Sequence, residues 1–457
     1  MTSAGIAALA TQYAGGVKIL VLGPGAREHA IILRLLAEQE PHDITCAPGN
    51  AGIALDVPCV NIDANDPDAA TSLAVGLDVD LVVIGPEAPL VAGVADAIRA
   101  RGIPVFGPNR AAAMLEGSKD FAKRIMSEAL VPTGRAITAL SLLEAETALD
   151  DYGAPYVVKA DGLAAGKGVL VTTDRDAAVA HASHWLAQGG VLIEEFLNGH
   201  EVSLFLLSDG HHVLPLSPAQ DFKRIFDNDE GPNTGGMGAY SPMPWLAQRF
   251  GSEEAFVREV IDTVGQPVIR VLEAEGTPFV GLLYCGLIIT ADGIRVIEFN
   301  ARFGDPETQA VLPRLVTPLS ELLFAAATGD LGGRPWPEFS ADRTVCVVLA
   351  SEGYPESPVT GREIVGLDSA RALAGVHLTH AATAAASDAS TDDALIATGG
   401  RVLSVVARAT SFGAARELAY TAIRRISLDG GQFRSDIAAV VTAAESKIAD
   451  AEPAGHI

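Results

Sequence analysis

Four short apolar runs in the first 110 residues each end in a loop rich in glycine, proline or asparagine. The runs are residues 17–22, 44–46, 81–84 and 104–106, and the loops after them are residues 23–29, 48–52, 85–90 and 107–109. Such runs are typical of buried parallel strands. Because open parallel sheets bind ligands at the carboxyl ends of their strands, we expect the loops to meet at one edge. The pattern predicts a doubly wound α/β domain over residues 17–117.

The first of these loops, residues 23–29, leads directly into a helix with apolar residues on one face. The first N–H groups of a helix have no intrahelical partner, so this layout suits a phosphate. We therefore expect Arg27 and the loop to hold a phosphate, and the alternative is an ordinary strand-to-helix turn. A dinucleotide fingerprint is disfavoured, because Glu28 stands where the pattern GxGxxG has its third glycine.

The 457 residues are too many for one hydrophobic core, so several domains are expected. Residues 1–16 lack a basic start and are expected to form a disordered extension. After the first domain we expect a second one over residues 118–330, whose flap subdomain covers about residues 131–197. A glycine- and proline-rich linker at residues 331–342 then precedes a small α+β domain over residues 343–445.

Composition narrows the possible partners. The net charge of −25 argues against nucleic acid or an anionic membrane as the main partner, so small molecules are favoured. The four cysteines are scattered and form no CxxC, which favours reduced thiols in the cytoplasm over a disulfide framework or a zinc site. No apolar run is long enough to span a membrane.

A lysine lies inside the apolar run 156–160, where its charge is costly to bury unless an anion meets it. The glycine-rich loop 161–168 follows Lys159, and a second strand begins at residue 169. Strand, glycine loop and strand predict a hairpin flap whose N–H groups cover phosphates, and a flexible hairpin tip is the alternative. Further along, a strand ends in Glu194 and Glu195, which could serve an adenine amino group and a ribose.

A strand over residues 293–300 runs into a polar turn. Residues two apart on a strand share a face, so Glu298 and Asn300 are expected to point the same way as Ile294, with Arg302 beyond them. A carboxylate and an amide oxygen suit Mg²⁺, which completes its coordination with water and phosphate oxygens. Arg302 could hold an anionic substrate. The alternative is a solvated strand end on the surface.

Five motifs occur together in the order of one ATP-grasp family. They are residues 23–29 (GPGAREH), 84–90 (IGPEAPL), 159–168 (KADGLAAGKG), 231–238 (GPNTGGMG) and 298–307 (EFNARFGDPE). In this combination the chain resembles the glycinamide ribonucleotide synthetases, or phosphoribosylamine–glycine ligases, over residues 17–438. The resemblance implies an N-terminal domain, an ATP-grasp core of two subdomains, and a C-terminal domain that closes over the site.

The resemblance also implies roles for particular residues. It implies that ATP is bound by Lys119, Lys159, Gly162, Gly166, Lys167, Gly168, Glu194, Glu195, Phe196, Leu197, Glu201, Arg224 and Asn233, and Mg²⁺ or Mn²⁺ by Glu298 and Asn300. To glycine and phosphoribosylamine we assign Gly23, Gly25, Arg27, Glu28, Asn50, Gly85, Pro86, Glu87, Asp221, Gly235 and Gly236. Lys223, Arg302 and Asp305 are the expected catalytic residues.

The activity implied by the resemblance is ATP-dependent ligation of glycine to 5-phosphoribosylamine in de novo purine biosynthesis, through a glycyl phosphate. We expect a monomeric, cytoplasmic enzyme. One rival is another ATP-grasp ligase that uses bicarbonate or formate in place of glycine. A second rival, from another class, is a nucleotide-binding module without catalysis.

Two positions depart from the family pattern. Many ATP-grasp enzymes carry another acidic metal ligand on the preceding strand, where this chain has Cys285, Gly286 and Leu287. Glu298 is therefore expected to be the main charged protein ligand of the metal ion. Ala382 stands where the family usually has glycine, which bears on the local turn and not on the chemistry.

Overall fold

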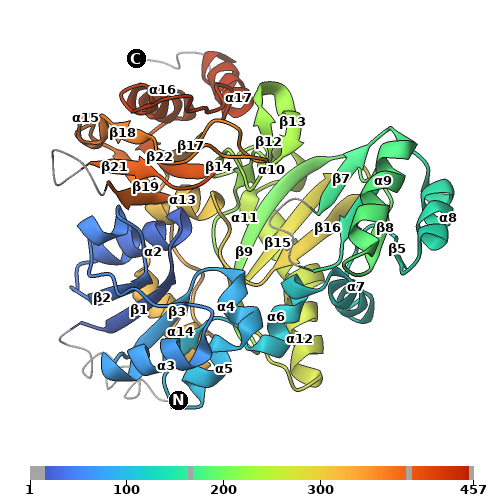
Figure 1. The fold of residues 1–457 in the computed structure, drawn as a ribbon, viewed down its shortest axis with the longest axis horizontal. Helices are drawn as coiled ribbons and strands as arrows, with labels where there is room; N and C mark the ends of the chain where they lie inside the picture. The colour runs from blue at the N-terminus through green and yellow to red at the C-terminus, as the bar shows by residue number, and fades with distance from the viewer. Residues whose placement is uncertain (1–15, 163–167, 387–393, 452–457) are drawn as a thin grey trace.

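The computed structural model describes residues 16–162, 168–386 and 394–451. The expected extension therefore lies outside the described residues except for Gly16, and so does the tip of the expected flap, residues 163–167. Figure 1 shows the N-terminal strands, the C-terminal strands and the sheet of residues 136–194 grouped around a central sheet. In the part of the chain that the structure describes, no helix is long and apolar enough to cross a membrane.

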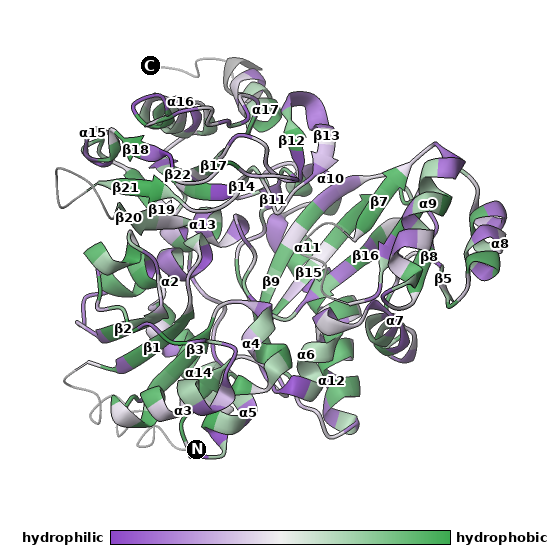
Figure 2. Ribbon diagram, in the orientation of Figure 1, coloured by the Kyte–Doolittle hydropathy of each residue, from purple (hydrophilic) through white to green (hydrophobic). Residues whose placement is uncertain are grey.

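The first sheet has four parallel strands in the order β2-β1-β3-β4. They are β1 (Lys18–Gly23), β2 (Asp43–Pro48), β3 (Leu81–Ile84) and β4 (Val105–Phe106), and the helices are α2 (Ala26–Leu36), α3 (Pro67–Gly76), α4 (Glu87–Ala92), α5 (Val94–Arg99) and α6 (Arg110–Gly117). Strand residues such as Leu20 and Val82 are fully buried, and Figure 2 shows these strands as hydrophobic. The predicted doubly wound α/β fold is confirmed.

The second sheet, in the order β5-β8-β6-β7, is antiparallel. Its strands are β5 (Ala136–Ala139), β6 (Tyr156–Ala160), β7 (Val169–Thr172) and β8 (Val191–Glu194), and α7 (Lys119–Glu128) leads into it. Two helices, α8 (Leu142–Tyr152) and α9 (Arg175–Leu186), pack on it around buried alanines. Because β6 and β7 pair with Lys159 opposite Val169, the predicted hairpin is confirmed.

The central sheet is antiparallel in the order β10-β9-β15-β16. Its strands are β9 (His200–Asp209), β10 (Val213–Pro215), β15 (Val280–Thr290) and β16 (Gly293–Asn300). Four helices accompany it: α10 (Leu246–Phe250), α11 (Glu253–Val260), α12 (Gln266–Ala274) and α14 (Leu319–Thr328). The buried face of α12 carries Val268, Ile269 and Leu272, as the 3.6-residue period of an amphipathic helix requires.

The expected alternation along β16 is wrong at one point. Gly286 on β15 pairs with Glu298, but the next residue, Leu287, pairs with Val296. Residue Ile297 is therefore an extra residue on β16, and a bulge of this kind reverses the faces that follow it. As a result Phe299 joins the buried side with Val296, while Glu298 and Asn300 still share the other face.

The C-terminal part forms two further sheets. The larger runs in the order β11-β14-β17-β22-β19 and the smaller in the order β20-β21-β18-β23. Their strands are β11 (Gln220–Asp221), β14 (Gly238–Ser241), β17 (Arg343–Ala350), β18 (Glu363–Val365), β19 (Val376–His380), β20 (Thr383–Ala385), β21 (Leu395–Ala397), β22 (Arg401–Ala409) and β23 (Ser427–Leu428), with helices α15 (Leu367–Arg371), α16 (Phe412–Ile423) and α17 (Ala439–Ala451). Ala382 is not among the described non-glycine residues with positive φ, so its turn does not require glycine.

The larger C-terminal sheet crosses the expected division between residues 118–330 and 343–445. Strands β11 and β14 belong to the earlier segment, yet β14 pairs antiparallel with β17 from Gly238 opposite Val347 to Ser241 opposite Thr344. One buried cluster likewise joins Val21 of β1, Leu207 of β9 and Leu323 of α14. The N-terminal and C-terminal parts therefore both pack directly against the segment between them. These contacts fix the positions of the three parts relative to one another.

Candidate active site

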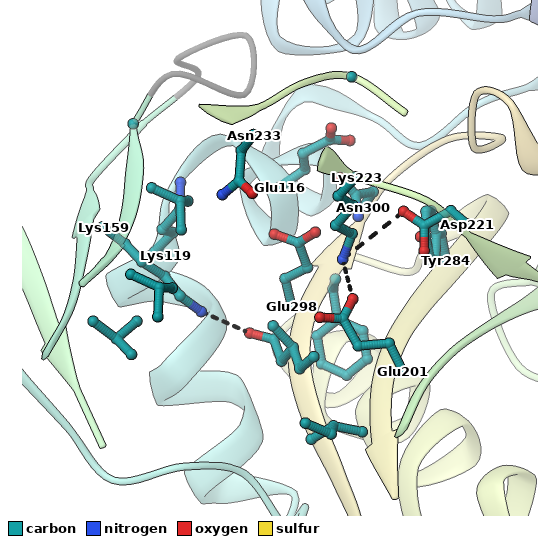
Figure 3. A pocket seen from close by; sticks show the side chains of 18 of the residues that line it. Glu116, Lys119, Lys159, Glu201, Asp221, Lys223, Asn233, Tyr284, Glu298 and Asn300 are labelled. Carbon is teal, nitrogen blue, oxygen red and sulfur yellow. Dashed lines mark hydrogen bonds and ion pairs between the residues drawn. The ribbon is translucent and has the colours of Figure 1, made fainter. Parts of the chain in front are cut away.

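A cavity of about 830 Å³ opens where the four groups of strands meet. Figure 3 shows charged side chains from opposite walls pointing into it. Among the predicted site residues, those that line it are Arg27, Glu87, Lys119, Lys159, Gly162, Gly168, Glu194, Glu195, Phe196, Leu197, Glu201, Asp221, Lys223, Arg224, Asn233, Gly235, Glu298, Asn300, Arg302 and Asp305. Gly166 and Lys167 lie outside the described residues.

Seven predicted residues lie outside the cavity lining: Gly23, Gly25, Glu28, Asn50, Gly85, Pro86 and Gly236. Glu28 is fully buried, and its carboxylate accepts hydrogen bonds from the N–H of Gly25 at 2.6 Å and from Arg27 Nε at 2.7 Å. Part of the helix N-terminus that was expected to hold a phosphate is thus occupied by the chain's own carboxylate. The role of this loop in substrate binding stays a prediction.

Three lysines approach the cavity from α7 and β6. Lys159 Nζ lies 2.6 Å from one carboxylate oxygen of Glu194, and Lys123 Nζ lies 3.2 Å from the other. Lys119 Nζ donates to the carbonyl of Gly162 at 3.2 Å. Burial lowers the pKa of Lys119, although the carboxylate of Glu298 opposes the shift. These ammonium groups form a positively charged wall that suits phosphate oxygens.

The two acids at the end of β8 both form ion pairs. Glu194 is engaged by the two lysines, and Glu195 pairs with Arg135 at 2.7 Å. Their carboxylates therefore form ion pairs in the wall and at its edge, and their expected contacts with adenine and ribose stay a prediction. Phe196 and Leu197 line the cavity beside them.

Glu298 and Asn300 reach the cavity from β16. Burial alone would raise the pKa of Glu298, but the cations of Lys223, Lys159 and Lys119 outweigh it and lower the pKa. Glu298 is therefore ionised, and a carboxylate beside an amide oxygen provides the hard ligands that Mg²⁺ prefers. Within the described ranges no group of three or more His, Cys, Asp or Glu is arranged to hold a metal. A cation here would complete its coordination with water and substrate oxygens.

Lys223 lies on the opposite side of Glu298 from Lys119 (Figure 3). Its Nζ is 2.6 Å from Glu201 Oε2 and 4.0 Å from Asp221 Oδ2. Burial raises the pKa of Asp221 to about 7, although Lys223 opposes the shift. The pKa of Lys223 is raised, because these carboxylates outweigh its burial. Lys223 thus stays positively charged beside an acid that titrates near neutrality.

Arg302 follows β16 and joins the N-terminal part to the site. Its guanidinium lies 3.2 Å from Glu87 Oε2 and 2.8 Å from Glu116 Oε1. Burial lowers the pKa of Arg302, but Glu116 and Glu87 outweigh it and the pKa is raised. Burial also raises the pKa of Glu116, despite the opposing charge of Arg302. Glu116 is a site residue that the sequence motifs did not identify.

The C-terminal part contributes two cavity residues that sequence reasoning missed. Arg401 donates to the carbonyls of Gly235 at 2.6 Å and Asp305 at 2.7 Å, and it pairs with the Asp305 carboxylate at 3.2 Å. The hydroxyl of Tyr354 accepts a hydrogen bond from the N–H of Gly235 at 2.9 Å. The sequence signal for Arg401, a pair of preceding glycines, is too common to have singled it out.

Three domain models of one enzyme match the chain. They describe the N domain, the ATP-grasp (A) domain and the C domain of phosphoribosylglycinamide synthetase, and they match residues 17–116, 117–308 and 344–440. The phosphoribosylamine–glycine ligase of Leifsonia xyli subsp. xyli is 68% identical over 424 residues, which cover 93% of this chain and 100% of that relative. The same enzyme from Streptomyces coelicolor is 55% identical over 425 residues, which cover 93% and 99%.

Solved structures give the same result. The phosphoribosylamine–glycine ligase of Thermotoga maritima superposes with a TM-score of 0.75 and 30% identity, covering 92% of this chain and 100% of that one. A biotin carboxylase from Campylobacter jejuni shares the fold alone, with a TM-score of 0.66 and 14% identity, covering 95% of this chain and 96% of that one. The chain therefore belongs to the phosphoribosylglycinamide synthetase family of ATP-grasp enzymes.

Proposed function

We propose that the protein ligates glycine to 5-phosphoribosylamine at the expense of ATP and yields glycinamide ribonucleotide, ADP and phosphate in de novo purine biosynthesis. The observation that carries the proposal is the cavity itself, in which a lysine wall faces Glu298 and Asn300. The relatives also support the proposal, since proteins named phosphoribosylamine–glycine ligase match over nearly the whole chain.

The first step is phosphoryl transfer. An oxygen of the glycine carboxylate bonds to the γ-phosphorus of ATP as the bond from that phosphorus to the bridging oxygen breaks, giving glycyl phosphate and ADP. Lys119 and Lys159 neutralise charge on the phosphates, which is the main work in such a transfer. Glu298 and Asn300 would hold Mg²⁺ or Mn²⁺, which supplies further neutralisation of the phosphate oxygens when bound.

The second step is acyl transfer. The amine nitrogen of phosphoribosylamine attacks the acyl carbon, inorganic phosphate leaves, and the nitrogen loses a proton. No side chain has to form a covalent intermediate. Asp221, whose pKa burial raises to about 7 and whose neighbour is Lys223, would accept that proton. Because an acyl phosphate hydrolyses readily, this step needs a site closed to water.

ATP, glycine and phosphoribosylamine would each bind in a different part of the cavity. The backbone around Phe196 and Leu197 would hold adenine, since the carboxylates of Glu194 and Glu195 are engaged elsewhere, and Glu201 would hold the ribose. Arg302 would orient the glycine carboxylate. Arg27, whose Nη1 also donates to the carbonyl of Phe303 at 2.9 Å, would meet the phosphate of phosphoribosylamine. We further propose a monomeric enzyme in the cytoplasm.

Exchange of ¹⁸O between the bridging and non-bridging positions of ATP tests the first step. We expect exchange that depends on glycine and needs no phosphoribosylamine, and full product formation only when the amine is generated in place. Bicarbonate or formate serves as the matched control carboxylate. Exchange with either of them and none with glycine would identify another ATP-grasp ligase, while tight ATP binding without any exchange would favour a binding module.

Two arginine variants test which substrate each arginine binds. Arg302→Ala should reduce the glycine-dependent exchange by roughly tenfold or more, because a guanidinium–carboxylate pair is lost. Arg27→Ala should leave exchange close to normal and raise the KM for phosphoribosylamine. The reverse pattern, with exchange lost only in Arg27→Ala, would show that the two roles are interchanged.

A further inference from the structure

The nucleotide side of the cavity includes a hairpin of β12 (Arg224–Phe226) and β13 (Glu230–Asn233). In the described part of the chain these strands pair only with each other. Arg224 pairs with Asn233 across the hairpin, and both residues line the cavity. A two-stranded hairpin is at best marginally stable in water, so its position must be fixed from outside.

The turn of this hairpin is unfavourable by itself. Asn228 has φ 59° and ψ 28°, and Asp229 has φ 55°. Two successive residues with side chains thus lie in the left-handed region, which Asn and Asp tolerate better than most residues but still do not prefer. Such a turn persists where its surroundings hold it in place.

Arg434, in the loop that precedes α17, provides that hold. Its side chain is 1% exposed, and its Nη1 donates to Asp229 Oδ1 at 2.7 Å and to the carbonyl of Arg224 at 3.1 Å. Its Nε and Nη2 donate to the carboxylate of Asp436 at 2.8 and 2.6 Å. The guanidinium also lies 5.0 Å from the ring centroid of Phe222. One buried cation therefore ties the turn and the backbone of a cavity residue to the C-terminal part.

The same loop makes further hydrogen bonds with the turn, including one from the Ser435 hydroxyl to the carboxylate of Asp227. The carboxylate of Asp436 accepts a hydrogen bond from the N–H of Asn228 at 2.9 Å. The carboxylate of Asp227 accepts one from the N–H of Ser435 at 2.7 Å. Three successive turn residues are thus fixed by one C-terminal loop, and the hairpin takes its position from that loop.

We propose that Arg434 is a positioning residue for the nucleotide, which acts through the hairpin on Arg224 and Asn233 and so sets the affinity for ATP with Mg²⁺. Arg434 itself is not among the described residues that line the cavity. The inference rests on the proposed function to the extent that the cavity takes ATP. Lysine is a poor substitute, because one ammonium cannot reproduce the planar fork that meets both carboxylates and the carbonyl.

Titration of ATP with Mg²⁺ onto the full-length protein, without glycine, tests the proposal. We expect Arg434→Met to raise the Kd by about tenfold or more, and Arg434→Lys to recover only part of that loss. The KM for glycine should stay within about twofold of the parent value, which a general loss of structure would not allow. Asp229→Asn, which keeps an oxygen acceptor but removes the charge that pairs with Arg434, should raise the Kd in the same direction by a smaller factor.

Arg416→Met is the matched control. Arg416, on α16, donates to the carbonyls of Ser435 at 2.6 Å and Ile437 at 3.1 Å, so it supports the same loop through contacts other than those with the hairpin. We expect this variant to lose stability without a change in Kd. An unchanged Kd in both Arg434→Met and Asp229→Asn, or an equal rise in Arg416→Met, would overturn the proposal. Because the titration contains no glycine, absence of ligation in the parent protein would contradict the proposed function alone.

Discussion

Glu298 is the carboxylate whose pKa the cations of Lys223, Lys159 and Lys119 lower despite its burial, and we propose it as the charged ligand for a metal ion. Opposite it on β15 stands Gly286, where a Cβ would lie 3.1 Å from Glu298 Cγ. We expect Glu298→Gln to lower turnover at saturating Mg²⁺ by roughly 10²-fold or more, while the free energy of unfolding changes by about 2 kcal/mol or less. Steady-state kinetics and urea unfolding measure the two effects, and near-normal turnover would contradict the metal role.

At this scale the sequence identified residues that lie within local motifs and missed those that meet across the fold. Glu298, Asn300 and Lys159 were found because a strand alternates and a buried lysine needs an anion. Glu116 and Arg401 were not found, because each meets its partner through a contact between segments that are far apart in the chain. The pairing of Glu194 with two lysines depends on how β8 lies beside β6 and α7, which no local pattern reveals.

At the scale of elements, β7 is an edge strand that continues from the glycine loop. We expect ATP with Mg²⁺ to slow hydrogen exchange of the amides in β6 and β7, since phosphates bound at Lys159 of β6 would restrain this hairpin. Strand β5, at the opposite edge of the same sheet, is the internal control and should exchange at the same rate with and without nucleotide. Equal exchange of β7 in both conditions would contradict its role as a flap.

The types of the elements were predictable because hydrophobic periodicity and helix capping depend on residues that are close together in the sequence. The capping box at the start of α8 shows this, with Ser141 Oγ accepting from the N–H of Glu144 at 3.3 Å and the Glu144 carboxylate accepting from the N–H of Ser141 at 3.2 Å. The bulge at Ile297 was not predictable, since an extra residue in a strand is defined by the pairing with its neighbour.

At the scale of the whole molecule, His380 joins the first and last parts of the chain. Its N–H donates to His29 Nδ1 at 2.9 Å, and its carbonyl accepts from Asn50 at 2.8 Å. Burial lowers the pKa of His380 from 6.5 to about 3, with smaller contributions from His29 and Arg371. Below pH 6.5 the unfolded chain binds a proton at this ring that the folded chain excludes, so stability falls as the pH falls from 6.5 toward 3.

We therefore expect this ring to lower the free energy of unfolding by about 2 kcal/mol between pH 7 and pH 5. Urea unfolding of the parent protein and of His380→Gln at both pH values measures the effect. The variant should be less stable at pH 7 but should lose less on acidification. The same loss on acidification in both proteins would show that another group controls the pH dependence.

The division of the chain was only partly readable from sequence. Composition and turn residues indicated a small C-terminal α+β unit, and this fold class is confirmed. They gave no sign that β14 would pair with β17, because an antiparallel pairing between strands about a hundred residues apart leaves no local pattern. The expected boundaries of the segments stay predictions.

That pairing has a consequence during synthesis of the chain. Residues 238–241 leave the ribosome well before their partner residues 344–347. At about 5–20 residues per second, the edge of β14 waits roughly 5–20 s for β17. During that interval an open strand edge is available to other chains, so the last quarter of the polypeptide should shield the middle from aggregation as well as completing its cavity. A nascent chain halted near residue 342 should accordingly need a chaperone that the finished protein does not.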